Sequence, residues 1–415
     1  MSAQVRHEVL IVGGGLVGAS LAIALDRVGV DVGLVEATAA GAMPAVFDQR
    51  NLSFADTTVN ALTALGVMQK LRAPAAPIRR IHVSREGDFG RVCLSASDYG
   101  REAFGQVVVA RDFGEALELR LTELQHLTRY RPARFDGLDA VSKPQAAQGL
   151  RRVRIIDDSG ERVLATRLLV AADGTRSGVR DALGIAAQSH DYAQTLLVAR
   201  LRAERAPDGT AYERFGDAGP TALLPRSDHH FGMAHGVARN LAEAVLALDD
   251  GDFLEHLQLA FGWRVGRLLA VGSRSAYPAL RLVAARTIAD RAVLVGNAAQ
   301  TLHPIGAQGF NLGLRDALTL AELIETKLRE HGAGDPGDAR LLAAYAERRR
   351  PDRERTLAFS DGLARVTANP VPPLRPLRSV GMLALDHLPS LQAWLVGGAM
   401  GYRGDVPALC RTDSA

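Results

Sequence analysis

The 415-residue sequence has few lysines and cysteines, and each scarcity excludes a class of protein. Its basic residues are nearly all arginine and are interspersed with acids, so the formal net charge is only +3 and no basic stripe of the nucleic-acid-binding kind is present. The two cysteines, Cys93 and Cys410, have neither metal-ligand nor redox spacing, which is typical of free thiols in a reducing compartment. We therefore expect no metal site and no nucleic-acid partner.

Long apolar runs are also missing. No stretch approaches the roughly 18 residues that a membrane span needs, and no signal peptide precedes the first apolar run. The sequence therefore predicts a cytoplasmic protein. A hydrophobic content of 47% with 23% charged residues is typical of a globular chain, and its length predicts two interleaved or consecutive domains.

Residues 8–36 have the pattern of a βαβ unit that binds a dinucleotide. An apolar run is followed directly by a glycine motif and then by a helical pattern, and a second short strand ends in Glu36. In dinucleotide-binding units, the carboxylate that binds a ribose hydroxyl follows the glycines by about 20 residues, and Glu36 lies close to this position. A carboxylate would repel a 2′-phosphate, so NAD or FAD is the expected tightly held cofactor. The motif residues expected to approach the cofactor are Gly13, Gly15, Leu16 and Gly18.

The stretch from Asp290 to Ala317 predicts a second ligand-binding loop. It opens with an apolar run, passes through His303-Pro304, and continues through a glycine-spaced turn that includes Gly309. Asn311 is predicted to be the N-cap of the helix that follows. The free N–H groups of such a helix start would suit an anion.

Two arginines precede or begin predicted helices. Arg50 stands before a helical pattern that ends near Leu71, and Arg111 begins one that runs to Leu127. Either arginine could reach a cofactor phosphate or ribityl chain, but a surface position for Arg50 and a plain salt bridge for Arg111 stay open. Further along, Asp173-Gly174 closes an antiparallel meander and by itself is typical of a turn.

These segments together resemble the single-component FAD-dependent aromatic hydroxylases. The resemblance rests on the first glycine motif, on residues 172–174 with Ser177 and Arg180, and on residues 296–311. Within the family, residues 105–108 and 297–304 are similar to the ubiquinone-biosynthesis branch, whose hydroxylases act on 2-polyprenyl-6-methoxyphenols. Most of the wider family has Asp where this chain has Asn297, whose amide oxygen can still accept a ribityl hydroxyl.

The resemblance implies a mixed α/β fold of the p-hydroxybenzoate-hydroxylase type. A discontinuous Rossmann-like FAD-binding domain would comprise residues 1–78, 98–188 and 286–368. An inserted antiparallel β-sheet domain for the substrate would comprise residues 79–97 and 189–285, with one helical stretch at Leu241–Phe261. Residues 369–415 would form a helical C-terminal segment, after a break in the chain at Asn369–Pro373.

The resemblance also implies a reaction. NADPH or NADH would reduce FAD transiently, O2 would add to the flavin, and the flavin hydroperoxide would hydroxylate a hydrophobic prenylated phenol. Glu36 would hold the adenosine ribose, and His303 and Pro304 would wall the edge of the flavin ring, His303 either as a proton donor or as a structural residue. The other expected cofactor contacts are Arg50, Arg111, Asp173, Asn297, Gly309 and Asn311, and the expected pocket residues are Tyr212, Leu224 and Phe231.

Other readings stay open at this point. The chain could be an FAD-dependent hydroxylase or reductase of another aromatic or prenylated substrate, or a non-catalytic prenyl-binding carrier on the same fold. The amphipathic C-terminal segment could dock on the protein itself, on other ubiquinone-biosynthesis proteins, or on the inner membrane as a peripheral contact. The sequence does not determine whether the chain forms a homo-oligomer.

Overall fold

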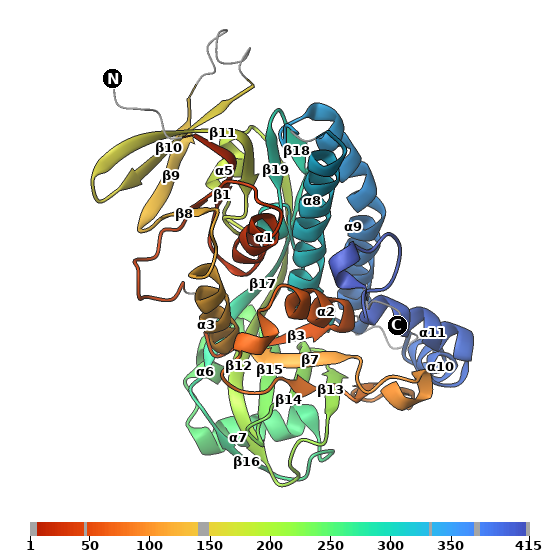
Figure 1. Cartoon of the computed structure of the whole chain (residues 1–415). Helices are drawn as coiled ribbons and strands as arrows, with labels where there is room; N and C mark the ends of the chain where they lie inside the picture. The colour runs from red at the N-terminus through yellow and green to blue at the C-terminus, as the bar shows by residue number, and fades with distance from the viewer. Residues whose placement is uncertain (1–5, 45–47, 140–148, 332–333, 369–373, 412–415) are drawn as a thin grey trace.

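The computed structural model describes residues 6–44, 48–139, 149–331, 334–368 and 374–411. Within these ranges the strands form three sheets, and Figure 1 shows the two larger ones above and below a small central one. The expected break in the chain at Asn369–Pro373 lies outside the described residues. The mixed α/β fold inferred from the sequence is confirmed.

The first sheet is built around parallel strands that begin at the N-terminus. Its order is β18-β19-β11-β1-β2-β8, and β10 and β9 extend it from β11 as an antiparallel meander. The central strands are buried on both faces, as their nearly continuous apolar runs require. The strands are β1 (Arg6–Val12), β2 (Val32–Val35), β8 (Leu127–Tyr130), β9 (Ala133–Leu138), β10 (Arg151–Asp157), β11 (Gly160–Ala171), β18 (Ile288–Ala289) and β19 (Ala292–Leu294).

Helices cover this sheet on the side that carries the largest hydrophobic cluster. Helices α1 and α8 pack against each other over the central strands, and α9 lies outside α8 (Figure 1). The helices of this part are α1 (Leu16–Asp26), α3 (Ala110–Leu121), α5 (Gly178–Ala182), α8 (Gln308–His331) and α9 (Ala339–Ala368).

The second sheet is a nine-stranded, largely antiparallel sheet with two different faces. Its order is β20-β17-β12-β15-β14-β13-β5-β6, with β16 paired to β12. Helix α7 packs on one face through Phe253, Leu257 and Phe261, and the other face lines a cavity. The elements are β5 (Arg80–Arg85), β6 (Arg91–Ser95), β12 (Ala187–Ala203), β13 (Thr210–Phe215), β14 (Pro220–Pro225), β15 (Phe231–Ala238), α6 (Ala242–Leu246), α7 (Asp250–Phe261), β16 (Leu268–Val271), β17 (Ser275–Ala284) and β20 (Gln300–Thr301).

A small third sheet and the C-terminal helices complete the described chain. The third sheet has the order β3-β7-β4, with α2 following β3 directly. Helix α10 packs on β6, and both C-terminal helices contribute to a small apolar cluster there. These elements are β3 (Asn51–Ala55), α2 (Asp56–Ala64), β4 (Ala76–Pro77), β7 (Gly105–Val109), α10 (Leu374–His387) and α11 (Pro389–Ala399).

Three helix predictions need correction. Arg50 precedes strand β3 rather than a helix, because residues 51–55 pair with β7. The helix beginning near Arg111 ends at Leu121, and the residues up to 130 supply the edge strand β8. The helical stretch 241–261 divides into α6 and α7, and the side chain of Asp249 caps the second helix by accepting from the backbone N of Asp252.

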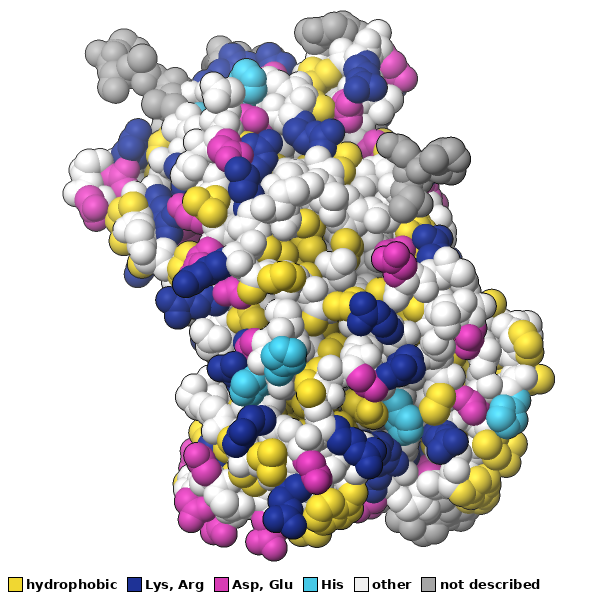
Figure 2. Space-filling model, turned by 60° about the horizontal axis from the view of Figure 1, so that its bottom comes forward, with side chains coloured by type: hydrophobic (Ala, Val, Ile, Leu, Met, Phe, Trp, Pro, Cys, Tyr) yellow, Lys and Arg dark blue, Asp and Glu magenta, His cyan; other side chains and the backbone are white. Residues whose placement is uncertain are grey.

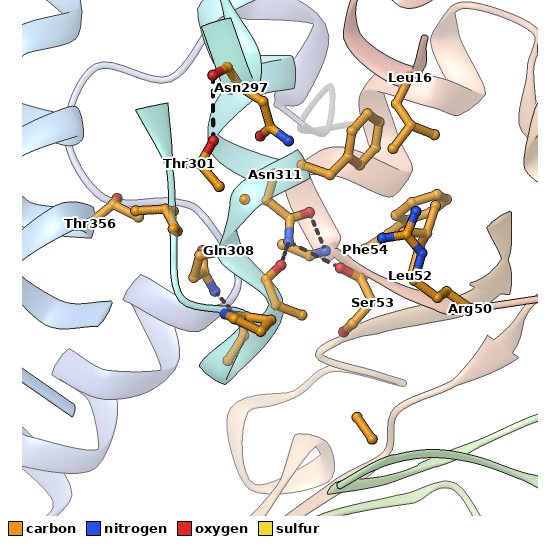
Figure 3. A pocket seen from close by; sticks show the side chains of 18 of the residues that line it. Leu16, Arg50, Leu52, Ser53, Phe54, Asn297, Thr301, Gln308, Asn311 and Thr356 are labelled. Carbon is orange, nitrogen blue, oxygen red and sulfur yellow. Dashed lines mark hydrogen bonds between the residues drawn. The ribbon is translucent and has the colours of Figure 1, made fainter. Parts of the chain in front are cut away.

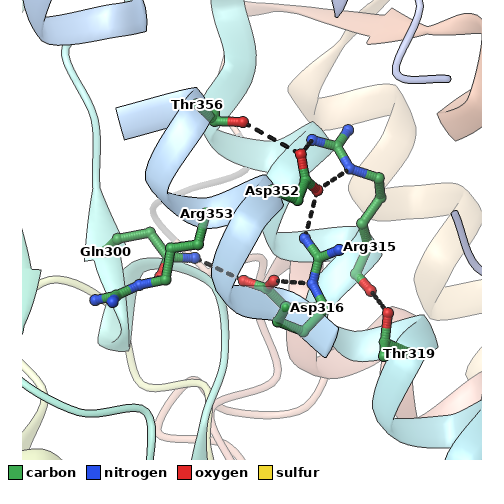
Figure 4. A network of polar contacts seen from close by, with 8 residues as sticks. Gln300, Arg315, Asp316, Thr319, Asp352, Arg353 and Thr356 are labelled. Carbon is green, nitrogen blue, oxygen red and sulfur yellow. Dashed lines mark hydrogen bonds and ion pairs between the residues drawn. The ribbon is translucent and has the colours of Figure 1, made fainter. Parts of the chain in front are cut away.

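A buried ion-pair network joins α8 to α9 (Figure 4). The guanidinium of Arg349 lies 2.7 Å from Asp316 and 2.6 Å from Asp352, and Asp352 also pairs with Arg315 at 2.8 Å. Burial alone would raise the pKa of Asp352, but the two arginines outweigh burial and lower this pKa to about 2. The carboxylate therefore stabilises the fold fully above its unfolded pKa of about 4, and this contribution is lost as the pH falls through about 2.

We predict that Arg349→Ala lowers the free energy of unfolding by about 3–5 kcal/mol, because it leaves two buried carboxylates without their shared partner. The matched control is Arg350→Ala, because Arg350 is the next residue, has a side chain that is 56% exposed, and pairs only with Glu347 among the described residues. This control should change stability by less than about 1 kcal/mol. Urea unfolding followed by circular dichroism measures both, and equal midpoints for the two variants would contradict the prediction.

Candidate functional site

One large cavity of about 1260 Å³ lies between the first and second sheets. Ligand sites of drug size occupy roughly 300–1,000 Å³, so this cavity has room for a dinucleotide and a second molecule. Its lining includes residues from all three sequence segments that carry the motifs: Gly13, Gly15, Leu16 and Glu36 from the first, Asp173 and Gly174 from the second, and Asn297, Pro304, Gly309 and Asn311 from the third. The motifs at 173–174 and 303–311 therefore meet at a single site.

The glycine motif after β1 forms one end of the cavity. Gly13 has a φ of +105°, and a Cβ on it would lie 2.4 Å from the carbonyl oxygen of Ala172. Gly18 does not line the cavity, but a Cβ there would lie 1.9 Å from the carbonyl oxygen of Gly13, so this glycine permits the close packing of α1 on the loop. No side chain in the described chain caps α1 at Gly15, which leaves the N–H groups of its first turn for a ligand.

Glu36 is held in place at the end of β2. Its carboxylate accepts hydrogen bonds from the backbone N of Gly14 at 2.9 Å and of Thr38 at 2.7 Å. These bonds use one lone pair of each oxygen and leave others directed away from the backbone. The carboxylate is thus available to hydroxyl donors of a ligand in the cavity.

Asp173 and Arg180 fix the second segment. The Asp173 carboxylate accepts from the hydroxyl of Ser177 at 2.5 Å and from the backbone N of Val179 at 3.1 Å, and burial raises its pKa. The buried Arg180 donates to the carbonyl oxygens of Thr175 at 3.1 Å and of Ala298 at 3.3 Å. Arg180 therefore ties the second segment to the third, a role that local sequence patterns did not reveal.

Asn311 connects the third segment to β3 (Figure 3). Its amide oxygen accepts from the backbone N of Ala55 at 2.9 Å, and its amide nitrogen donates to the carbonyl oxygens of Ser53 at 3.0 Å and Ala307 at 2.9 Å. The prediction that Asn311 is an N-cap is wrong, because α8 already begins at Gln308. The side chain instead holds the start of α8 against the third sheet.

His303 and Pro304 are neighbours in the sequence, but their side chains have different surroundings. Pro304 lines the cavity, whereas His303 is buried beside it: its Nδ1 lies 3.2 Å from the backbone N of Ile305, its Nε2 lies 3.3 Å from Gln194, and its ring packs edge-on against Tyr192. Burial lowers the pKa of His303 to about 4, so the ring is neutral near pH 7. The structure therefore favours the structural role for His303 over that of a proton donor to a bound ligand.

The two arginines singled out in the sequence have different surroundings. Arg50 lines the cavity, pairs with Asp48 at 2.9 Å, and places its guanidinium 4.4 Å from the ring centroid of Tyr277. Arg111 is not among the residues that line the cavity; its side chain is 58% exposed and pairs with Glu115 one helical turn later. The salt-bridge alternative therefore describes Arg111.

The expected substrate residues divide between the two faces of the second sheet. Leu224 lines the cavity. Tyr212 also contributes to the lining, although its ring lies against Phe261 on the α7 side. Phe231 must be removed from the pocket, because it is buried in the cluster that packs the sheet on α7.

The cavity residues fit FAD. Gly174, Gly306 and Gly309 line the cavity, and a Cβ on any of them would enter space in which the described chain places no atom within 4 Å. The backbone can therefore come close to a flat ligand at three points. At one end of the cavity, the carboxylates of Glu36 and Asp173 can accept hydrogen bonds from hydroxyl groups of a ligand. At the other end, the cavity is lined by the apolar face of the second sheet. No group of three or more His, Cys, Asp or Glu in the described ranges could hold a metal ion.

Comparisons with known proteins agree with this geometry. The family described as "FAD binding domain" matches residues 6–360. The chain is 34% identical to the "Ubiquinone hydroxylase UbiL" of Rhodospirillum rubrum over 401 residues, covering 96% of this chain and 91% of that protein. It is 28% identical to the "3-demethoxyubiquinol 3-hydroxylase" of Escherichia coli over 408 residues, covering 95% of this chain and 98% of that protein.

A solved structure supports the fold. The p-nitrophenol 4-monooxygenase PnpA of Pseudomonas putida superposes with a TM-score of 0.76 at 17% identity, covering 95% of this chain and 97% of that one. At this identity the likeness bears on architecture alone. It agrees with the expectation of a p-hydroxybenzoate-hydroxylase-like arrangement.

We predict that Gly13→Ala weakens FAD binding at least about tenfold, because the added methyl group collides with the carbonyl of Ala172 and displaces the loop. The matched control is Gly29→Ala, which imposes the same kind of backbone strain at a φ of +75° but meets no described atom within 4 Å. Titration of the flavin-free protein with FAD, followed by flavin fluorescence, measures both affinities. Equal affinities for the two variants would contradict the assignment of this loop.

Proposed function

Because the chain belongs to the FAD-binding family whose profile covers residues 6–360, we propose that it is an FAD-dependent monooxygenase that hydroxylates a polyprenylated phenol in ubiquinone biosynthesis. The observation that carries the proposal is the single cavity, in which the dinucleotide motifs at one end meet an apolar sheet face at the other. A phenol with a prenyl tail is a hydrophobic ligand that suits such a face.

The residues of the cavity have distinct proposed roles toward FAD. Glu36 would bind the adenosine ribose, Asp173 and Asn297 would hold the ribityl and pyrophosphate region, and Arg50 would face a phosphate or the ribityl chain. The turn from Pro304 to Gly309 would support the flavin ring, and the start of α8 would stabilise negative charge on it. When bound, FAD supplies the redox chemistry by which NADPH or NADH and O2 place an oxygen atom on an aromatic ring.

The chain itself supplies orientation and a dry chamber. Side chains of the second sheet exclude water from one side of the turn; those that line the cavity include Leu196, Val198, Ala222, Leu224 and Leu280. Excluding water protects reactive intermediates from hydrolysis and strengthens polar contacts inside the site. Asn311 fixes the distance between the turn and the third sheet, so that the chamber has a defined width.

We predict that the purified protein, supplied with FAD, NADPH or NADH, O2 and a short-chain 2-prenyl-6-methoxyphenol, forms a product that is heavier by one oxygen atom. With ¹⁸O2 the added mass should carry the label. Cofactor oxidation without an oxygenated product would favour a reductase or a hydroxylase of another aromatic. Failure to bind flavin at all would favour a non-catalytic prenyl-binding carrier.

The C-terminal helices support a proposal about membrane contact. One side of α10 and α11 packs on β6, whereas Leu377, which is 68% exposed, and Val380, Leu388 and Leu391 face outward. Figure 2 shows hydrophobic side chains gathered at this edge of the molecule. No described helix has the length and apolar character needed to cross a bilayer.

The cavity reaches these same helices. Met382, Leu385 and Trp394 line it, and Trp394 is also 56% exposed, so this tryptophan stands where the cavity meets the surface. Its ring lies 3.7 Å from the guanidinium of Arg403. We propose that a prenyl tail enters beside Trp394 and that the exposed apolar residues rest on an anionic bilayer, as amphipathic helices do. The protein would then be peripheral to the inner membrane.

We predict weak sedimentation of the protein with anionic liposomes, which is lost on truncation after Pro373. Because truncation also uncovers β6, the sharper variant is Leu377→Gln with Val380→Gln, which changes exposed residues only. Each substitution should weaken binding about tenfold through lost apolar burial. Leu259→Gln is the control, since Leu259 is 76% exposed, more than Leu377 or Val380, on the distant helix α7. Equal sedimentation of all forms would refute the membrane contact.

A further inference from the structure

The cavity face of the second sheet is apolar around one carboxyl group. Glu213 lies in β13, where its register partners are Ala222 of β14 and Val83 of β5. Side chains alternate along a strand, so Ala211, Glu213 and Phe215 share one face, and all three line the cavity. An acid between two apolar residues on that face therefore points into the chamber proposed for the substrate.

Glu213 differs from the other carboxylates of the cavity. Glu36 accepts two backbone N–H groups, Asp173 accepts from Ser177 and Val179, and Asp352 pairs with two arginines. Among the described residues, none donates a hydrogen bond to Glu213 or forms an ion pair with it. The side chain of Glu213 is half-buried, and a carboxyl partly withdrawn from water without a protein partner is costly, so a donor from a ligand would satisfy it.

Charged groups reach the cavity around Glu213 from several elements. Of the two neighbouring strands, β14 presents Ala222 and Leu224 to the cavity and β5 presents Arg85, whose guanidinium pairs with Asp217 and donates to the carbonyl oxygen of Glu86 at 3.1 Å. The charged side chains from the facing helices and the C-terminal segment are Arg315, paired with Asp352, and Arg355, Arg378 and Arg403. Burial raises the pKa of Glu213 to about 7, and no charged group contributes to that change.

We propose that Glu213 binds the hydroxyl group of the phenol substrate and acts as the general base for its proton. The inference rests on the proposed function and adds the residue that positions the ring. A carboxylate on the sheet and the turn at 304–309 would hold the substrate from opposite sides, so that the ring carbon to be hydroxylated faces the turn.

The phenol O–H bond breaks, the proton moves to a carboxylate oxygen of Glu213, and the electron pair stays on the phenol oxygen, which makes the ring more electron-rich. The hydride of NADPH or NADH and one proton from solvent reduce O2 to the level of a peroxide. One oxygen atom then bonds to the ring as a hydroxyl group, and the other leaves as hydroxide, which takes the proton that the ring carbon loses and becomes water. The proton on Glu213 returns to the oxygen from which it came.

The decisive variant is Glu213→Gln, which keeps the size and a hydrogen-bonding oxygen but cannot accept the proton. In the wild-type FAD-loaded protein, kcat for hydroxylation should rise with pH through about 7 and then level off, because the ionised carboxylate is the active form. In Glu213→Gln this rise should disappear and kcat should fall about 100-fold, the lower range for general-base catalysis. Glu213→Asp should retain the pH-dependent rise at a reduced rate.

A second readout does not depend on turnover. The affinity of the FAD-loaded protein for a short-chain 2-prenyl-6-methoxyphenol, measured by flavin fluorescence without NADPH or NADH, should increase above pH 7 in the wild type and be independent of pH in Glu213→Gln. Glu86→Gln is the control, since Glu86 is exposed next to Arg85 and lies outside the cavity lining. FAD content should be equal in all forms.

The outcomes separate the two proposals. If Glu213→Gln hydroxylates at the wild-type rate with an unchanged pH profile, the role of Glu213 is overturned while the hydroxylase function stands. If the wild type forms no hydroxylated product, the proposed function fails. In that case the pH dependence of phenol binding still decides the role of Glu213: affinities that respond to pH alike in wild type and Glu213→Gln overturn it.

Discussion

The side-chain amide of Asn311 is the contact on which the site depends. It joins the start of α8, which rests on the first sheet, to β3 of the third sheet through two hydrogen bonds, and a third bond ties it to the carbonyl oxygen of Ala307 in the turn before the helix. A buried amide that lost these bonds would leave backbone groups unpaired at the centre of the molecule. Because the turn at 304–309 immediately precedes this contact, its position relative to the first and third sheets is fixed by Asn311.

This joint allows two chemically opposite environments to share one cavity. At the first sheet, glycines and helix N-termini present backbone N–H groups and carboxylates that suit phosphates and ribose. At the second sheet, alternate residues of antiparallel strands present an apolar face, and α7 buries the reverse face. A polar cofactor and a hydrophobic substrate can therefore meet at the turn without either entering an unsuitable environment.

The sequence predicted the parts of the site that depend on local patterns. The glycine motif after β1 and the acid at the end of β2 follow from spacing within one βαβ unit, and the turn around Pro304 follows from its own residues. The remaining features of the site depend on tertiary packing between segments that are distant in the sequence. His303 is adjacent to a cavity residue, but Tyr192 and Gln194 of β12 enclose it, and no local pattern shows this.

Local sequence patterns are equally limited for residues in strands. Leu224 and Phe231 both lie in strand-like stretches of the sequence, and only the placement of α7 determines that one faces the cavity and the other the core. Glu213 was missed because an acid in a strand is usually exposed. The signal was present in its neighbours Ala211 and Phe215, which mark that face of β13 as apolar. Its isolation, however, comes from the way β13 pairs with β14, the next strand, and with β5, which is distant along the chain.

The arrangement of cofactor and substrate in one cavity can be tested by a crystal structure of the FAD-loaded protein. We expect the adenosine ribose at Glu36, the flavin ring against the turn from Pro304 to Gly309, and open space between that ring and the sheet face that carries Glu213. A flavin ring bound away from this turn, or one that fills the space in front of Glu213, would contradict this arrangement.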